Sequence, residues 1–210
     1  MTIGLEEGAR ALGLAPSAQQ IEQLEAYGAL ILKWNKVYNL TALRDEASVR
    51  THHLLDSLAA IGPLTRQRPG TTRLLDVGAG AGLPGVVIAI MRPDIAVSCL
   101  DAVAKKMAFV QQVAGELKLP NLRGVHARVE SLQGEYEAIS SRAFASLADF
   151  VAGSGHLLAK DGVWMAMKGK VPTEEIQALN PAVDVFHVEQ LEVPGLDAER
   201  CIVWARKSGE

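Results

Sequence analysis

The stretch LLDVGAGAGLPG, from Leu74 to Gly85, holds four glycines within eight residues, directly after a short apolar run. The run RLLDV predicts a strand and the following PGVVIAIM predicts a helix, so the glycines fall in the turn between the two. Glycine allows positive φ and leaves no Cβ between the backbone and a ligand. The helix that begins near Pro84 directs free N–H groups toward the same turn. The stretch therefore predicts a strand–loop–helix unit that binds a nucleotide-like ligand.

Two glycine spacings coexist in this loop. Gly80, Gly82 and Gly85 fit G-x-G-x-x-G, the spacing of dinucleotide-binding loops. Gly78, Gly80 and Gly82 instead form an acid-x-G-x-G-x-G series that begins with Asp76. A tight turn without a ligand is a third interpretation, but four glycines make a costly turn because each loses much backbone freedom on folding. Spacing alone leaves both NAD and S-adenosylmethionine open as ligands.

Two acids favour S-adenosylmethionine. Asp101 ends the next predicted strand, about where a carboxylate binds ribose hydroxyls, and either cofactor brings a ribose. Asp76 discriminates between them, because a carboxylate repels pyrophosphate but attracts the sulfonium and ammonium groups of S-adenosylmethionine. We therefore predict S-adenosylmethionine as the cofactor, with NAD as the alternative. The contacts predicted from these residues are Asp76, Gly78, Gly80, Gly82 and Asp101.

From Arg73 onward, short apolar runs alternate with helical stretches. Strands are predicted for RLLDV, IAVSCLD, LRGVHAR, EAISSR, GVWMAMKG and the two late runs VFHVEQLEV and RCIVWARK. Such alternation is typical of a parallel sheet with helices on both faces, and the short turn between the last two runs indicates one antiparallel strand. The predicted fold class is α/β, a Rossmann-like sheet that is mostly parallel with its last strand antiparallel.

The chain before this sheet predicts helices. Apolar residues recur near the helical period from Ser17 to about Ile61, and Pro16 with Ser17 supplies a helix start signal. GPLTRQRPGTT, residues 62–72, contains two prolines and two glycines without apolar periodicity, which predicts a linker. We expect a helical N-terminal region over residues 1–66 and an S-adenosylmethionine-dependent methyltransferase domain over residues 67–210.

The composition is that of a soluble globular protein, with 49% hydrophobic residues and a net charge of −3. No apolar run approaches the ~20 residues that span a bilayer, and the first residues lack the basic and apolar regions of a signal peptide, so we expect a cytoplasmic protein. Cys99 and Cys201 lie in apolar runs and are expected to be buried free thiols. His52 and His53 point to different sides of a helix, so no metal site is expected and His53 is predicted to be structural.

The charge is unevenly distributed. Residues 1–26 carry four acids and one base, whereas residues 27–73 carry seven bases and three acids, a local net charge of +4. Such a segment could meet phosphate, or its bases could be solvated on ordinary helix faces. Trp34 and Tyr38 could stack on a base, but their helical spacing fits the core better. The bases of this segment that we single out are Lys33, Lys36, Arg66 and Arg68.

Six stretches of the chain resemble a known family. They are YNLTALRDEASVRTHHLLDSL, LLDVGAGAGLPG, LDAVAKKMAFVQQV, ARVESL, ISSRAFASL and MKGK. Together they resemble the bacterial small-subunit (16S) ribosomal RNA guanine-N7 methyltransferases, also called glucose-inhibited division protein B. The resemblance covers about Asn35 to Arg206 and includes the helical N-terminal part. It implies a Rossmann-like class I methyltransferase sheet with a helical N-terminal extension. It also implies transfer of a methyl group from S-adenosylmethionine to N7 of one guanine in 16S ribosomal RNA.

The resemblance also implies cofactor contacts. In this sequence they fall on Gly78, Leu83, Val129, Glu130 and Arg142. Val129 and Glu130 follow a predicted strand, at the edge where ligands of open α/β sheets bind, but they could equally be the start of a helix. Arg142 could pair with the methionine carboxylate, with an RNA phosphate or with a structural acid.

The resemblance implies that the partner is 16S ribosomal RNA or the small-subunit particle. We expect the protein to be a monomer. Lys168 and Lys170, in MKGK, join the bases above as candidate RNA contacts, although a solvated turn would explain them too. The N7 of guanine carries a lone pair and no proton, so no general base is needed and no catalytic residue is assigned. A methyltransferase for another substrate, an NAD-dependent oxidoreductase and a cofactor-binding module without catalysis stay open.

Overall fold

A computed structural model describes residues 3–142, 144 and 146–209. Met1, Thr2 and Glu210, at the ends of the two predicted regions, and Ala143 and Ala145, within ISSRAFASL, lie outside the described residues. The described strands form one seven-stranded sheet in the order β3-β2-β1-β4-β5-β7-β6. The strands are β1 (Arg73–Val77), β2 (Ala96–Asp101), β3 (Leu122–His126), β4 (Tyr136–Arg142), β5 (Leu158–Lys168), β6 (Val183–Leu191) and β7 (Arg200–Lys207).

The pairing of the strands confirms the predicted fold class. Strands β3, β2, β1, β4 and β5 pair in parallel, whereas β7 runs antiparallel to both β5 and β6. In β1, Leu74 packs into the hydrophobic cluster on one face and Leu75 into the cluster on the other. Successive side chains of a strand point to opposite faces, so a strand buried on both sides is apolar throughout.

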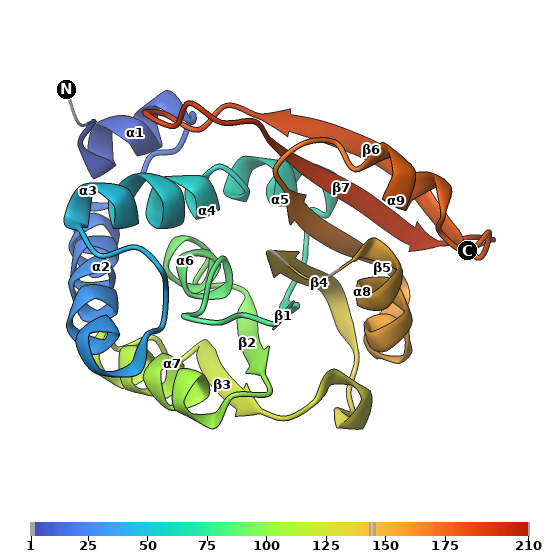
Figure 1. Ribbon diagram of the computed structural model, residues 1–210, viewed down its shortest axis with the longest axis horizontal. Helices are drawn as coiled ribbons and strands as arrows, with labels where there is room; N and C mark the ends of the chain where they lie inside the picture. Colours follow the sequence, from blue (N-terminus) through green and yellow to red (C-terminus); the bar gives the residue numbers. More distant parts are fainter. Residues whose placement is uncertain (1–2, 143, 145, 210) are drawn as a thin grey trace.

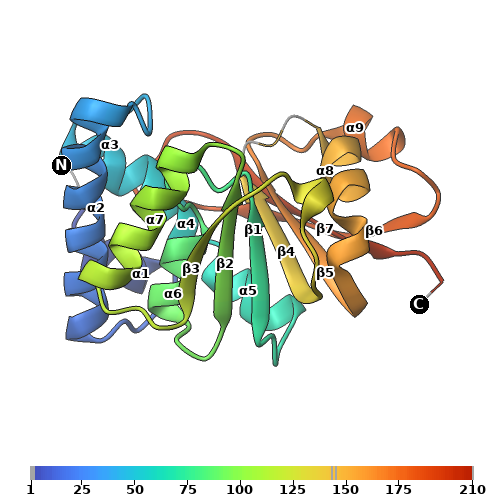
Figure 2. The same ribbon diagram turned by 90° about the horizontal axis from the view of Figure 1, so that it is seen from below.

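Helices cover both faces of this sheet (Figures 1 and 2). The N-terminal helices, α6 and α7 share one hydrophobic cluster, and α8 and α9 pack with the other. The helices are α1 (Leu5–Ala11), α2 (Ala18–Tyr38), α3 (Glu46–Val49), α4 (Asp56–Leu58), α5 (Ile61–Gln67), α6 (Gly85–Met91), α7 (Ala104–Glu116), α8 (Leu147–Ser154) and α9 (Thr173–Gln177), with a π-helical turn over Arg50–Leu55.

The long helix α2 begins where the sequence predicts. Ser17 Oγ accepts a hydrogen bond from the Gln20 N–H, and the Gln20 side chain accepts one from the Ser17 N–H, which is a complete capping box. Asn39 ends the helix in the left-handed conformation at φ 49°, a position that asparagine tolerates. In Figure 1, α2 lies beside α7 at the margin of the molecule.

The linker predicted over residues 62–72 is wrong in its first half, because α5 spans Ile61–Gln67. Pro63 is the third residue of that helix, where a backbone N–H has no partner within the helix and is not missed. The helix forms because Ile61 and Leu64 are buried, at 4% and 0% exposure. The hydrophobic cluster that contains Leu64 also contains residues of α6 and α7. The division into two domains at residue 66 stays a prediction.

Candidate functional site

The turn between β1 and α6, residues 78–85, is called the glycine loop below. Its glycines 78, 80 and 82 have φ values of +67°, +59° and +93°, which L-residues rarely adopt. A Cβ on Gly82 would lie 2.5 Å from Val86 Cγ2, so this position is also closed to any side chain. A Cβ on Gly80 would meet nothing nearer than the Gly78 carbonyl oxygen, at 4.0 Å. Bare backbone with open space beside it therefore forms this part of the loop.

Asp76 lies beneath the glycine loop. Its side chain is fully buried and accepts hydrogen bonds from the Gly85 N–H at 2.9 Å and from Ser140 Oγ at 2.9 Å. Burial raises the pKa of Asp76 to about 6, although both hydrogen bonds act to lower it. A Cβ on Gly85 would lie 2.9 Å from Asp76 Oδ2, so this glycine is required by packing. Asp76 thus ties β1 to α6, and its action on a bound cofactor stays a prediction.

Asp101 ends β2 beside the same loop. Its Oδ2 accepts a hydrogen bond from the Gly80 N–H at 3.1 Å, and its Oδ1 accepts one from the Val103 N–H at 2.9 Å. Lys106 Nζ lies 3.4 Å from Oδ2, and the Asp101 side chain is 9% exposed. Carboxylate oxygens accept more than one hydrogen bond each, so Asp101 can still accept hydrogen bonds from hydroxyl groups of a ligand. The open backbone at Gly80 beside an acceptor fits a cofactor with a ribose.

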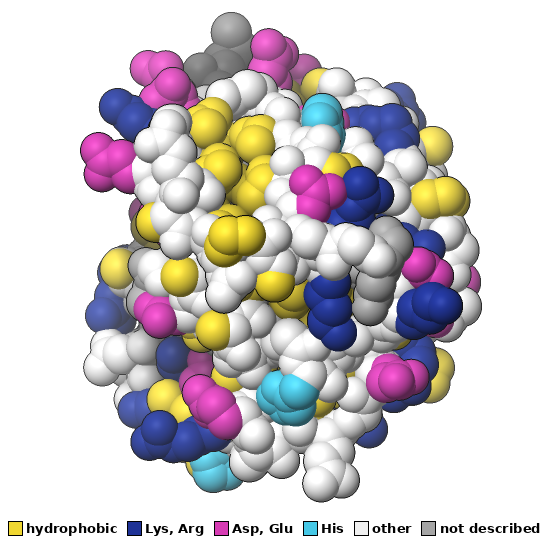
Figure 3. Space-filling view, turned by 90° about the vertical axis from the view of Figure 1, so that its right-hand side faces the viewer, with side chains coloured by type: hydrophobic (Ala, Val, Ile, Leu, Met, Phe, Trp, Pro, Cys, Tyr) yellow, Lys and Arg dark blue, Asp and Glu magenta, His cyan; other side chains and the backbone are white. Residues whose placement is uncertain are grey.

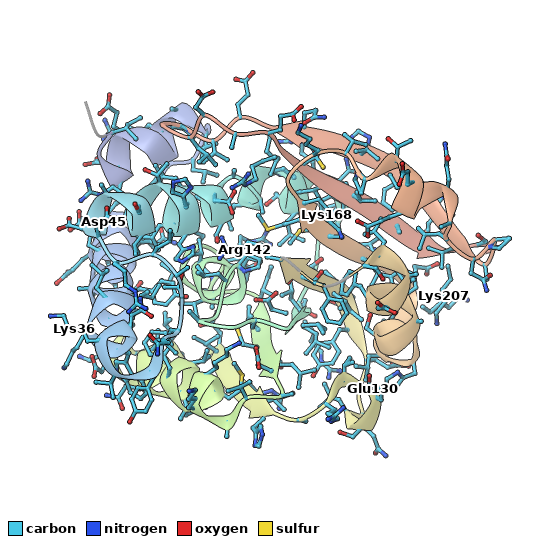
Figure 4. The ribbon with its side chains drawn as sticks, viewed as in Figure 1. Lys36, Asp45, Glu130, Arg142, Lys168 and Lys207 are labelled. Atoms are coloured by element: carbon cyan, nitrogen blue, oxygen red, sulfur yellow. The ribbon has the colours of Figure 1, made fainter. Side chains whose placement is uncertain are left out.

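A cavity of about 570 Å³ adjoins the glycine loop. Gly80 and Leu83 contribute to its wall together with residues 40–43, the π-helical turn and the ends of β4 and β5. Of the predicted site residues, the structure brings four together in this wall: Gly80, Leu83, Arg142 and Lys168. Figure 4 shows Arg142 and Lys168 in the interior of the view, near the strand ends.

Four side chains in the cavity wall, Asp56, Arg142, Arg200 and His53, form what we call the charged cluster. Asp56 is 2% exposed. Its two oxygens accept hydrogen bonds from Arg142 Nη1 at 3.0 Å and from Arg200 Nε at 2.8 Å. The sequence leaves three partners open for Arg142, and the structure shows one of them, a structural acid, which is Asp56. The Arg142 side chain keeps 20% exposure, so its predicted cofactor contact stays a prediction.

His53 completes the charged cluster as a neutral base. Arg142 Nη2 lies 3.2 Å from His53 Nδ1, and Thr41 Oγ1 lies 2.7 Å from His53 Nε2. Burial, with the charge of Arg142 adding, lowers the pKa of His53 to about 4. Nδ1 also lies 3.1 Å from the His52 carbonyl oxygen, so either tautomer of the neutral ring pairs both of its nitrogens. This satisfied, 9% exposed side chain agrees with the predicted structural histidine. No metal-binding group of three or more His, Cys, Asp or Glu occurs among the described residues.

Val129 and Glu130 lie apart from the cavity. They begin the short 3₁₀ turn Val129–Ser131 after β3, where Val129 is buried and Glu130 is exposed. Val129 belongs to the cluster beneath α8, and Figure 4 shows Glu130 toward the lower margin, away from Lys168. Their position near the carboxyl end of β3 is compatible with a cofactor contact, which stays a prediction.

The predicted RNA contacts are dispersed. Lys33 and Lys36 are exposed on α2, and Figure 4 shows Lys36 at the outer margin. Lys168 Nζ lies 2.9 Å from Glu175 Oε2, and Lys170 is 85% exposed. On the face seen in Figure 3, basic side chains alternate with acidic ones.

The two arginines of the predicted linker differ in their surroundings. Arg66 is 61% exposed and pairs with Glu189 of β6. Arg68 is half-buried, and its charge is among the interactions that lower the pKa of Glu137. Glu137 lies near the start of β4, at the opposite end of that strand from Arg142. Arg68 therefore lies away from the cavity, whereas its contact with RNA stays untested.

Sequence reasoning did not find Asp56, Arg200 or Tyr27 as site residues. Asp56 and Arg200 meet across 144 positions of the chain, a separation that no local spacing indicates. Tyr27 donates a hydrogen bond from its hydroxyl to the Ala81 carbonyl at 2.7 Å. Its helical spacing with other apolar residues marks it only as part of the core.

Both predicted buried thiols are confirmed, because Cys99 and Cys201 are free and buried.

Comparisons of the sequence agree on one family. The family described as GidB, rRNA small subunit methyltransferase G, matches residues 20–203. The ribosomal RNA small subunit methyltransferase G of Acidovorax sp. (strain JS42) is 61% identical over 212 residues, covering 96% of this chain and 93% of that protein. The protein of the same name from Methylibium petroleiphilum is 58% identical over 208 residues, covering 98% and 94%.

Comparisons of the structure find methyltransferases. TrmN from Thermus thermophilus superimposes with a TM-score of 0.57 at 20% identity, covering 75% of this chain and 53% of that one. The glycopeptide N-methyltransferase MtfA gives a TM-score of 0.60 at 10% identity, covering 71% and 95%. At these identities the likeness concerns the fold alone. The resemblance read from the sequence is confirmed by the relatives above: the chain belongs to the GidB family of rRNA small subunit methyltransferases G.

Proposed function

We propose that the protein transfers a methyl group from S-adenosylmethionine to N7 of a guanine in 16S ribosomal RNA. The observation that supports this most is the shared wall between the glycine loop and the cavity. Gly80 takes part in both, since its N–H donates a hydrogen bond to Asp101 and the residue lines the cavity. A cofactor on the loop and a base in the cavity would then be neighbours. Membership of the GidB family supplies the substrate class.

The cofactor, when bound, supplies an electrophilic methyl group. The glycine loop and Asp101 would hold it, with Leu83, Arg142, Val129 and Glu130 as further predicted contacts. Because N7 of guanine has a lone pair and no proton, this chain has to position and desolvate the base rather than deprotonate it. A neutral His53 whose two ring nitrogens are both engaged agrees with a site that needs no proton acceptor.

The bases around the cavity suit an RNA chain. Lys168 lies in the wall, and Arg142 and Arg200 together exceed the single charge of Asp56. A positively charged wall favours the phosphates that flank a target base. Reaching one base requires a nucleotide splayed out of its stack. Lys33, Lys36 and Lys170 would follow the RNA backbone further away.

We also propose that the protein is a monomer that acts in the cytoplasm on ribosomal RNA or on the small-subunit particle. Within the described residues, every helix is too short or too polar to cross a bilayer. The NAD-dependent alternative finds no support in the comparisons, since the matched family and the structures named above are methyltransferases.

A labelling experiment tests the proposal. The purified protein is incubated with methyl-labelled S-adenosylmethionine and with ribosomal RNA or small-subunit particles from cells that lack the gene. We expect label at one guanine, recovered as N7-methylguanine, and the same nucleotide unmodified in the deletion strain. Label in a protein or small molecule, or at another atom of the RNA, would show that the substrate is wrong. Tight binding of NAD in place of S-adenosylmethionine would overturn the cofactor.

A further inference from the structure

Helix α2 is attached to the core by polar side chains on one of its faces. Gln20, Gln23 and Tyr27 recur at positions i, i+3 and i+7, which share a helix face. Gln20 Nε2 donates to the Ile90 carbonyl at 3.0 Å, and Gln23 Nε2 donates to the Leu117 carbonyl at 2.9 Å. These carbonyls lie at the C-terminal ends of α6 and α7, where the last carbonyls of a helix have no hydrogen-bond partner within it. Two glutamines therefore fix α2 against the helices that follow β1 and β2.

The third side chain of this face reaches the glycine loop itself. The hydroxyl of Tyr27 donates a hydrogen bond to the Ala81 carbonyl at 2.7 Å, and the side chain is fully buried. Its ring stacks on Phe109 of α7 with 6.4 Å between ring centres. Burial raises the pKa of Tyr27 well above its ordinary value, so the hydroxyl keeps the proton that it donates.

This contact sets the orientation of one peptide group in the loop. The carbonyls of Ala79 and Gly82 accept hydrogen bonds from backbone N–H groups of the loop and of α6. The Ala81 carbonyl instead accepts from Tyr27, and the Gly82 N–H on the same peptide donates to Ala79 at 2.8 Å. Glycine at position 82 permits a wide range of φ, so no Cβ at that residue opposes rotation of this peptide. Rotation would turn the Ala81 carbonyl away from α2 and break both bonds.

We propose that Tyr27 is a positioning residue of the cofactor site: its hydroxyl holds the 81–82 peptide so that the glycine loop keeps its ligand-binding conformation in the free protein. The inference rests on the proposed use of the loop for S-adenosylmethionine. It assigns the N-terminal helix a task in cofactor binding, besides any contact with RNA. Preorganisation of this kind raises affinity because less ordering remains to be done on binding.

The substitution Tyr27→Phe tests this role. It removes one hydroxyl, while Phe109 and the two glutamines hold the ring and the helix. Calorimetry without RNA should show S-adenosylmethionine bound about tenfold more weakly, the loss expected for one buried hydrogen bond. Hydrogen exchange in the free protein should be faster at the amides of Gly82 and Leu83. At saturating cofactor the methylation rate should return close to that of the wild type.

Tyr136→Phe is the matched control. Tyr136 is 1% exposed, and its hydroxyl accepts a hydrogen bond from Arg123 Nη2 at 3.3 Å. It lies at the start of β4, remote from the glycine loop. Both variants lose a buried hydroxyl, so the thermal stability of both should fall. The cofactor affinity and the loop exchange of Tyr136→Phe should stay at the wild-type level.

The outcomes separate the inference from the proposed function. If the wild type binds S-adenosylmethionine and Tyr27→Phe binds it equally well, or if both Tyr variants lose affinity alike, the positioning role is wrong and the proposed function stands. If the wild type itself does not bind S-adenosylmethionine, the proposed function fails and takes the inference with it. A weaker affinity confined to Tyr27→Phe, with faster exchange at Gly82, supports the role.

Discussion

The glycine loop and the charged cluster adjoin the same cavity but are built in different ways. The loop is one continuous segment, residues 78–85, whose shape comes from backbone conformation and from the buried Asp76 beneath it. The cluster joins three distant segments through Asp56, Arg142 and Arg200. The comparison teaches that a site can combine a segment whose shape depends on glycine at fixed positions with a cluster that depends on charge balance.

The loop should be the more sensitive of the two regions. Gly82→Ala combines a positive φ with a Cβ placed 2.5 Å from Val86 Cγ2, so we expect a loss of about 3 kcal/mol in the free energy of unfolding. Gly70→Ala is the control, because Gly70 also has a positive φ of +78° but nothing within 4 Å of a Cβ. It should lose only about 1 kcal/mol. Urea denaturation of both variants measures the difference, and equal losses would contradict the close packing of the loop.

The charged cluster should respond to loss of its acid. Asp56→Ala leaves two guanidinium groups without their carboxylate, and since the arginine side chains keep 20% and 25% exposure, we expect a loss of about 2 kcal/mol, below the usual cost for fully buried pairs. Asp184→Ala breaks an exposed pair with Arg206 and should cost at most about 1 kcal/mol. Thermal and urea unfolding compare the two. A loss no larger for Asp56 than for Asp184 would show that the cluster contributes little.

The two regions should also respond to pH in opposite directions. Asp76 has its folded pKa raised from 3.8 to about 6, so its contribution to stability is present below pH 3.8 and is lost as pH rises through 6. His53 has its folded pKa lowered from 6.5 to about 4, so its contribution is present above pH 6.5 and is lost as pH falls through 4. The limiting slope for one group is about 1.4 kcal/mol per pH unit.

Two neutral variants separate these opposing effects. Asp76→Asn removes the contribution of Asp76, so stability should fall more steeply than in the wild type as the pH is lowered from 6 to 4. His53→Gln removes the contribution of His53, so stability should fall less steeply than in the wild type, or rise, over the same interval. Denaturation at a series of pH values provides the measurement. Parallel curves for all three proteins would mean that neither group is perturbed by its region.

The smallest effects should come from the bases outside both regions. Lys33 and Lys36 are exposed, so replacing both with alanine should flatten the log–log salt dependence of RNA binding by about one unit for each phosphate that a lysine neutralises in the wild type. Arg66→Ala with Arg68→Ala should change it less, since Arg66 pairs with Glu189 and Arg68 is half-buried. Cofactor affinity should be unchanged in both. Wild-type slopes throughout would move the RNA footprint elsewhere.

What could be predicted from the sequence follows the same division. The strand, loop and helix from Arg73 to Met91 were predictable because local periodicity and glycine spacing determine them, and so was the sheet built from repeats of that unit. The helix over Ile61–Gln67 was missed because Pro63 and Gly62 suggest a break, while the burial that stabilises the helix comes from distant residues. Asp56, Arg200 and Tyr27 were missed for the same reason: each acts through a partner at least 54 positions away.

The measurement that tests the cofactor site most directly is the affinity of Asp101→Ala for S-adenosylmethionine, determined by calorimetry against the wild type. If Asp101 accepts hydrogen bonds from the ribose hydroxyls, its removal should cost about 1.5–3 kcal/mol of binding free energy, roughly a 10- to 150-fold loss of affinity. Asp101→Asn, which can still accept a hydrogen bond from the Gly80 N–H, should lose less if part of the effect passes through the loop. Unchanged affinity in a folded Asp101→Ala variant would contradict a cofactor held between Asp101 and the glycine loop.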